Sequence, residues 1–195
     1  MSIKSSWEIA LERTKDVEPD RENVEANRLL TEGKKLVSRF LDDDTLDLTA
    51  LIAEFAKEQQ PGVGTGVLDA LSSNLNLPVD EFALRRNRRA AEGLAAIISD
   101  KRKLQMLTQQ LEQFFGEYLQ ERNQVREAVD RQYQPRLQQK EEELARRTGQ
   151  RVRIDPASDP EYVGLLRQQL VLLEDKYGTV LKQVKQEISD MYDRG

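Results

Sequence analysis

Apolar residues along this chain recur at the three- and four-residue spacing of amphipathic helices, and no stretch shows the strict alternation of a β-strand. The longest helical pattern runs from about residue 79 to residue 147, and Pro135 is its one strong breaker. A connector follows at residues 148–158, and a second helix is predicted over about residues 159–193. The sequence therefore predicts an all-α protein.

The last predicted helix carries the most regular apolar row of the chain. Its members step by three and four residues in turn, which is the heptad spacing of a coiled coil. They are Val163, Leu166, Leu170, Leu173, Tyr177, Val180 and Val184. Because the connector is short, we expect this helix to fold back antiparallel, with Val163–Met191 lying along Leu144 back to Phe114. Residues 79–195 are therefore expected to form a long antiparallel helical hairpin or coiled coil.

The first helix of this hairpin has a further apolar row, for which the hairpin itself leaves no partner. Large apolar side chains in such a row need to be buried, so the N-terminal part of the chain, another subunit, or both should cover them. We expect the row to form the interface of a homo-oligomer, most simply a dimer, and charges at Leu104 and Leu111 to separate its subunits. The row consists of Ile97, Leu104, Leu107, Leu111, Phe114 and Phe115.

Residues 1–78 predict a small cluster of short helices. Ser5 and Glu8 have the spacing of a capping box, which would open a short helix. The glycine-rich segment from Gln60 to Gly66 is predicted to be a loop, and Pro78 closes the cluster. Glycines also lie inside the later helical patterns, where their cost in helix stability indicates close packing between helices. These are Gly93, Gly116 and Gly178.

The composition excludes most familiar enzyme classes. The 195 residues include no Cys and no His, so the chain has no disulfide, zinc cluster, thiol nucleophile or Ser-His-Asp triad. The net charge is −5, with acidic residues concentrated in residues 1–78 and basic residues in 79–109, which argues against a dedicated DNA-binding protein. No catalytic residue, cofactor or metal site is indicated, and we expect a non-enzymatic interaction or scaffold protein with a protein partner that the sequence does not identify.

Two segments leave other functions open. Pro61–Gly66 has the glycines of a phosphate-binding loop but lacks its Lys and following Ser or Thr, so a flexible interhelical loop is favoured over a nucleotide-responsive site. Four arginines share a predicted helix face that would suit nucleic-acid phosphates or an acidic lipid surface. Without interleaved aromatics, pairing with the acidic N-terminal part or with a partner subunit is favoured. The four are Arg85, Arg86, Arg88 and Arg89.

The opening residues Ser2–Thr14, SIKSSWEIALERT, resemble the start of a family of uncharacterised bacterial proteins. This resemblance implies a bacterial origin and no assigned function. The N-terminus carries charge throughout, unlike a secretory signal, and no apolar run approaches the roughly 20 residues of a membrane-spanning helix. The protein is therefore expected to be cytoplasmic.

Overall fold

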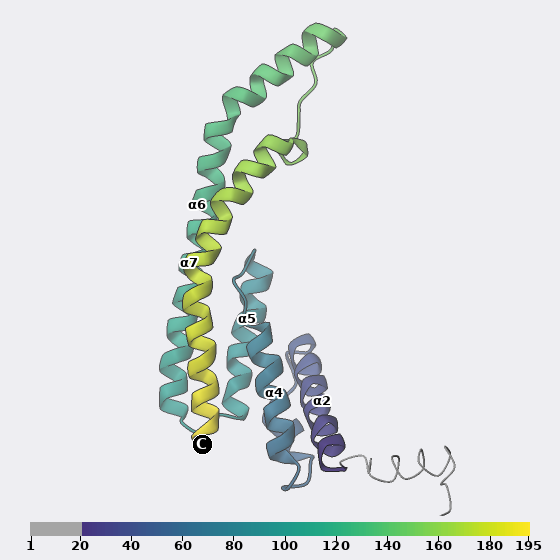
Figure 1. The fold of residues 1–195 in the computed structure, drawn as a ribbon, viewed down its shortest axis with the longest axis vertical. Helices are drawn as coiled ribbons and strands as arrows, with labels where there is room; N and C mark the ends of the chain where they lie inside the picture. Colours follow the sequence, from purple (N-terminus) through teal and green to yellow (C-terminus); the bar gives the residue numbers. More distant parts are fainter. Residues whose placement is uncertain (1–20) are drawn as a thin grey trace, which may run out of the picture.

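The computed structural model describes residues 21–195, and this part of the chain is helical without any strand (Figure 1). The expected capping box at Ser5 and Glu8 lies outside the described residues. The helices are α2 (Arg21–Asp42), α3 (Leu48–Ala53), α4 (Gln60–Asn74), α5 (Glu81–Gly93), α6 (Lys101–Thr148) and α7 (Pro160–Asp193), with 3₁₀ turns at Leu94–Ala96 and Pro156–Ser158.

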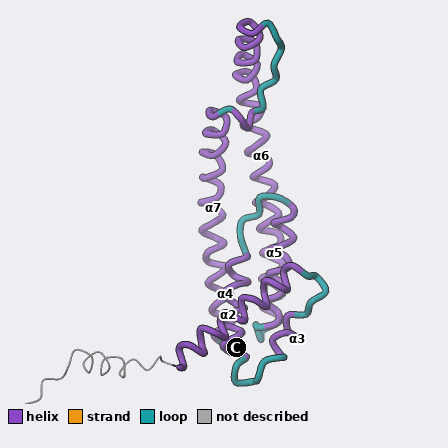
Figure 2. The backbone as a smooth tube through the Cα atoms, turned by 90° about the vertical axis from the view of Figure 1, so that its right-hand side faces the viewer, coloured by secondary structure: helices purple, strands orange, loops and turns teal. Residues whose placement is uncertain are grey.

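The helices form a bundle from which a two-helix arm projects (Figures 1 and 2). Helices α4 and α5 pack against the first half of α6 and the second half of α7, and α2 packs on α4 on the side away from the hairpin. The remainder of α6 and α7 extends beyond this bundle. At 1.5 Å per residue, the 48-residue α6 is about 72 Å long. The all-α fold with a long antiparallel hairpin is confirmed.

The bundle has one continuous apolar core. Val63, Val67 and Leu71 on α4 are completely buried, as is Leu94 after α5. The same cluster continues to Met191 near the end of α7, so its members come from both sides of residue 78. Residues 21–78 therefore pack onto the base of the hairpin.

The continuous helix expected over residues 79–147 is wrong, because the chain reverses between α5 and α6. Leu94 and Ile98 are turned into the core, with 0% and 1% of their surface exposed. Asp100 then starts α6 by accepting a hydrogen bond from the backbone N–H of Lys103 at 2.9 Å. Burial of the two apolar residues and the new helix cap together outweigh the continuation of one helix.

As a result, α5 lies antiparallel to the first half of α6. Arg88 Nε lies 3.0 Å from Glu112 Oε1, and Arg122 Nη1 donates to the Val79 carbonyl oxygen at 3.2 Å. Helix α6 is therefore flanked by both α5 and α7 inside the bundle.

The glycine-rich segment is also helical, so the expected loop at Pro61–Gly66 is wrong. It forms the first turns of α4, with Pro61 in the first turn, where its missing N–H costs nothing. A Cβ on Gly66 would overlap the backbone carbonyl of Leu30, and one on Gly33 that of Val63. The glycines allow the backbones of α2 and α4 to touch, and this packing offsets their poor helix propensity.

Close packing accounts for one of the three mid-helix glycines singled out in the sequence. A Cβ on Gly93 would lie 2.9 Å from side-chain atoms of Leu71 and Phe40. No atom lies within 4 Å of a Cβ built on Gly116 or Gly178, so the close approach expected at those two positions is wrong within the described chain.

Helix α7 returns along α6, but in a different register from the one expected. Tyr133 packs on Tyr162, Tyr118 on Tyr177, and Lys103 Nζ lies 2.9 Å from Glu187 Oε1. Val163 is thus nearest to residues around Tyr133, not to Leu144. The connector causes the difference: it runs back along α6, where the backbone N–H of Ile154 donates to Glu141 Oε1 at 2.8 Å, before α7 begins.

The seam of α7 differs from the expected heptad row at two positions, Val163 and Val180. Leu173 and Tyr177 are buried, whereas Val163 is 45% and Val180 42% exposed. Their neighbours Tyr162 and Leu181 are buried in their place, because a larger side chain buries more apolar surface. Three further members are partly buried: Leu166, Leu170 and Val184.

Two glycine-to-alanine substitutions test the packing of the bundle. We expect Gly66→Ala to lower the free energy of unfolding by roughly 2 kcal/mol or more, because the new methyl group overlaps the α2 backbone. The matched control Gly178→Ala should raise it by about 0.5–1 kcal/mol, since the site is open and alanine favours helix. Urea unfolding followed by circular dichroism measures both, and equal effects would contradict the packing described.

Candidate functional site

The six residues expected to form an oligomer interface lie in the core of the chain itself. Leu104, Leu107, Leu111 and Phe115 are at most 5% exposed, and Ile97 and Phe114 pack against the same cluster. They share this cluster with buried residues of α4, α5 and α7. Charged substitutions at Leu104 and Leu111 would therefore disrupt the fold of the bundle. The expectation that these substitutions separate subunits does not fit the burial of the two residues within one chain.

Arg89 is a structural residue that holds the turn between α2 and α3. Its guanidinium lies over the Phe40 ring, 3.7 Å from the centroid, and donates to the carbonyl oxygen of Leu46 at 2.9 Å and of Asp44 at 3.3 Å. Its side chain is only 20% exposed. The fork of the guanidinium is needed here because several carbonyl oxygens at the end of α2 lack helical partners.

The other three arginines diverge from Arg89 and from one another. Arg86 lies 3.4 Å from Asp42, and Arg88 pairs with Glu112 on α6. Arg85 is exposed and has no ion pair with a described residue. Pairing of Arg86 and Arg89 with the acidic N-terminal part, which the sequence favoured, is what the structure contains, and the four do not form one basic face.

The outer half of the arm is closed by a polar cluster between α6 and α7. Lys140 Nζ lies 2.7 Å from Asp159 Oδ2, 2.9 Å from Glu161 Oε2 and 2.9 Å from the Tyr133 hydroxyl. Asp159, 5% exposed, is also the N-cap of α7, accepting from the Glu161 backbone N–H at 3.0 Å. Below this cluster the apolar core consists of Val129, Tyr133 and Tyr162.

The pKa shifts in this cluster stabilise the charged forms of Lys140 and Asp159. The hydrogen bond from Lys140 holds the pKa of Asp159 below its usual range, and the same contact raises the pKa of Lys140. Burial raises the pKa of the Tyr133 hydroxyl. A lysine or tyrosine that transfers protons near neutral pH needs a lowered pKa, so these groups keep their ordinary charges and fasten the start of α7 to α6.

The end of the arm carries basic residues that the sequence analysis did not single out. Residues 144–154 contain four arginines and no acidic residue. Arg146 and Arg147 lie 3.8 and 4.0 Å from Glu142 and Glu143, whereas Arg151 and Arg153 form no ion pair or side-chain hydrogen bond within residues 21–195. The signal was present in the sequence as the segment LARRTGQRVRI, which reads as a helix end followed by a connector.

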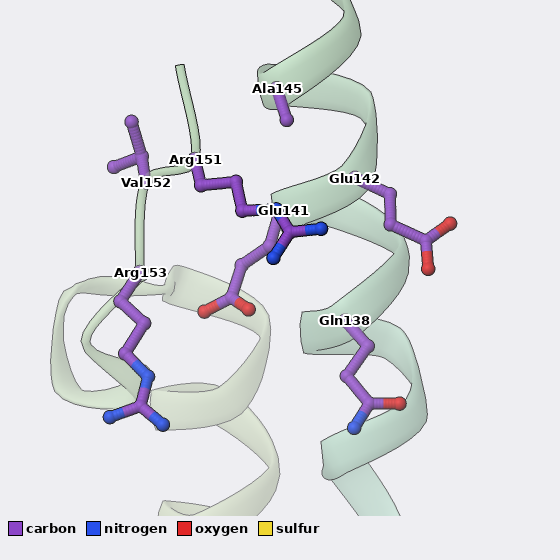
Figure 3. A pocket seen from close by; sticks show the side chains of 7 residues that line it. All are labelled: Gln138, Glu141, Glu142, Ala145, Arg151, Val152 and Arg153. Carbon is purple, nitrogen blue, oxygen red and sulfur yellow. The ribbon is translucent and has the colours of Figure 1, made fainter.

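Arg151 and Arg153 line a shallow pocket of about 450 Å³ between the connector and α6 (Figure 3). Figure 3 shows the Arg151 side chain reaching across toward α6, where Glu141 also faces the connector and Glu142 points away. The remaining lining residues are Gln138, Ala145 and Val152. The pocket therefore combines two exposed guanidinium groups with two carboxylates and a small apolar surface.

Within residues 21–195, no group of acidic side chains is placed to hold a metal ion. No helix in this part of the chain is long and apolar enough to span a membrane.

Comparison with known proteins gives one match. The model of a family of unknown function, DUF6657, matches residues 49–190. This range includes α4 to α7 with the whole arm, and it excludes the opening residues on which the sequence resemblance rested. No curated protein and no solved structure matches the chain.

Replacement by lysine distinguishes the contribution of Arg89, which holds the turn between α2 and α3, from that of Arg88, which pairs with Glu112 on the surface. We expect Arg89→Lys to lower the free energy of unfolding by roughly 1–2 kcal/mol, because an ammonium group cannot reach the carbonyl oxygens and the Phe40 ring together. Arg88→Lys, at an exposed pair, should change it by less than about 0.5 kcal/mol. Urea unfolding measures both, and similar losses would remove the role given to Arg89.

Substitution of Asp159 tests the lock on the arm. Asp159→Asn keeps a side-chain oxygen for the helix cap but removes the charge facing Lys140. Hydrogen exchange in the first turns of α7 should therefore be faster than in the wild type at neutral pH. Because the pKa of Asp159 is lowered in the fold, its contribution is complete above the usual carboxyl range and lost as the pH falls through the lowered value, so the two proteins should converge in acid.

The control for this experiment is Asp100→Asn, which alters the corresponding N-cap of α6. Asp100 accepts from the Lys103 backbone N–H and has no ion pair among the described residues. Its substitution should leave hydrogen exchange in the first turns of α7 unchanged at every pH. A pH-independent effect of Asp159→Asn would show that the charge on Asp159 does not fasten the arm.

Proposed function

The chain belongs to this family of unknown function, and we propose from its geometry that it is a non-enzymatic interaction protein. Its docking surface lies at the outer end of the arm. The bundle serves as the base, and the connector with the last turns of α6 forms the surface that meets a protein partner. We place this role in the bacterial cytoplasm, in keeping with the absence of Cys.

The observation that supports this proposal most strongly is the isolation of the outer arm. Helix α5 begins beside Arg122 of α6, and beyond Glu127 only α7 and the connector accompany α6 (Figure 1). A two-helix extension adds little to the core, since one cluster of three buried residues supports it. Long helices that are ordered for so little apolar burial are explained by a need to carry the end of the arm away from the bundle.

The chemistry of the described residues favours binding over catalysis. The polar cluster around Lys140 keeps its groups in their ordinary charge states. The pockets of the outer arm are shallow and lie beside the connector, unlike the enclosed sites typical of enzymes.

The alternative functions have lost the features that suggested them. Pro61–Gly66 is the start of a helix packed on α2, so it offers no phosphate-binding loop. The arginines of α5 are dispersed among separate contacts. Homo-oligomerisation stays a prediction, and a dimer would have to use residues other than the buried row from Ile97 to Phe115.

Site-specific photo-crosslinking tests the proposal. A photoreactive residue in place of Gln150 lies at the end of the arm, and one in place of Lys57 lies exposed on the bundle as a matched control. In the cell of origin, we expect the Gln150 probe to give a discrete adduct with another protein that the Lys57 probe does not give. Adducts from the bundle alone, or equal adducts from both positions, would contradict a docking surface at the end of the arm.

A further inference from the structure

We propose that the partner bound at the end of the arm is an acidic polypeptide segment in extended conformation, recognised by Arg151 and Arg153. This inference rests on the docking surface proposed above and names the chemistry of its ligand. The two guanidinium groups are exposed and unpaired within the described chain, and residues 144–154 carry no negative charge. The Glu141 carboxylate, which lines the same pocket, already accepts a hydrogen bond from the backbone N–H of Ile154. A pair of free guanidinium groups is well suited to bind carboxylates in the bidentate geometry.

The connector also has free backbone groups beside these arginines. The N–H and C=O groups of Arg151, Val152 and Arg153 form no hydrogen bond with another described residue. The segment is nevertheless fixed in place, because Ile154 N–H is bound by Glu141 and Gly149 N–H by the Ala145 carbonyl at 2.9 Å. An anchored segment with unpaired backbone groups can add an extended partner chain by main-chain hydrogen bonds.

The spacing of the two arginines specifies the pattern of the partner. In an extended chain, side chains two residues apart lie on the same side and about 6.6–6.8 Å apart. Acidic residues at alternate positions of the partner would match Arg151 and Arg153. Apolar contacts are available beside them, since Val152 is 45% and Leu144 37% exposed.

A nucleic acid fits this surface less well. Residues 134–161 contain no aromatic side chain on which a base would stack. The short basic surface with its apolar neighbours therefore favours a peptide.

Fluorescence anisotropy with defined probes tests the inference on the full-length protein. The probe is a labelled peptide of sequence Gly-Ser-Glu-Thr-Glu-Val-Glu-Ser-Gly, and the comparison probes are its Glu-to-Lys counterpart and single-stranded oligothymidine. We expect the acidic peptide to bind in low salt and the lysine peptide not to bind. Combined Arg151→Glu and Arg153→Glu substitutions should weaken binding about tenfold or more, whereas Arg85→Glu, at an equally exposed and unpaired arginine, should not.

Each outcome bears on the inference. Loss of peptide binding only in the Arg151 and Arg153 variant, with an unchanged circular dichroism spectrum, supports it, and the milder Arg151→Gln and Arg153→Gln pair should show the same direction. Absent peptide binding, binding unaffected by these substitutions, or tighter arginine-dependent binding of oligothymidine overturns it. The docking surface itself would survive any of these results if the Gln150 photo-crosslink is specific, so the two proposals fail separately.

Discussion

The antiparallel pairing of α6 with α7 is the interaction on which the rest of the structure depends. Helix α6 is the shared element: inside the bundle it is packed by α5 and α7, and in the arm α7 alone covers it. Two helices cannot enclose a core, so the arm uses side chains that are apolar along their length and polar at the end. Tyr133, Tyr162 and Tyr177 bury their rings in the seam while their hydroxyls reach carboxylates at its edge, as in the 2.8 Å contact of Tyr177 with Glu121. Burial and this contact raise the pKa of Tyr177 to about 12, which keeps the hydroxyl a donor.

The base and the arm are stabilised in different ways, and this difference supports the division of roles. In the base, glycine contacts bring α2 against α4, and completely buried side chains such as Val63 and Leu71 form a tight core. In the arm, stability comes from a few rings and from the charged cluster around Lys140, which lies at the level where α7 begins. This charged cluster thus lies where the connector enters α7, and it holds the basic end of the arm in position.

Local signals in the sequence predicted the helices well, and long-range contacts account for most errors. Gly149 at φ +72° and the Asp159–Pro160 start of α7 follow directly from helix-capping rules. The reversal at Ser99–Asp100 was missed because it depends on where Leu94 and Ile98 are buried, and the α4 glycines were misread because only α2 explains them. The register of the hairpin depends on the path of the connector along α6, which no periodicity encodes. The basic end of the arm was visible as four arginines, but their lack of partners became apparent only in three dimensions.

Carbodiimide crosslinking tests the pairing of α6 with α7 most directly, because it joins only lysines and carboxylates in contact. The structure predicts links between Lys103 and Glu187, Lys176 and Glu121, and Lys140 and Glu161, at separations of 2.9, 3.2 and 2.9 Å. A mixture of isotopically light and heavy protein assigns each link to one chain or two. The account predicts all three links within single chains; their absence, or their formation between light and heavy chains, would contradict it.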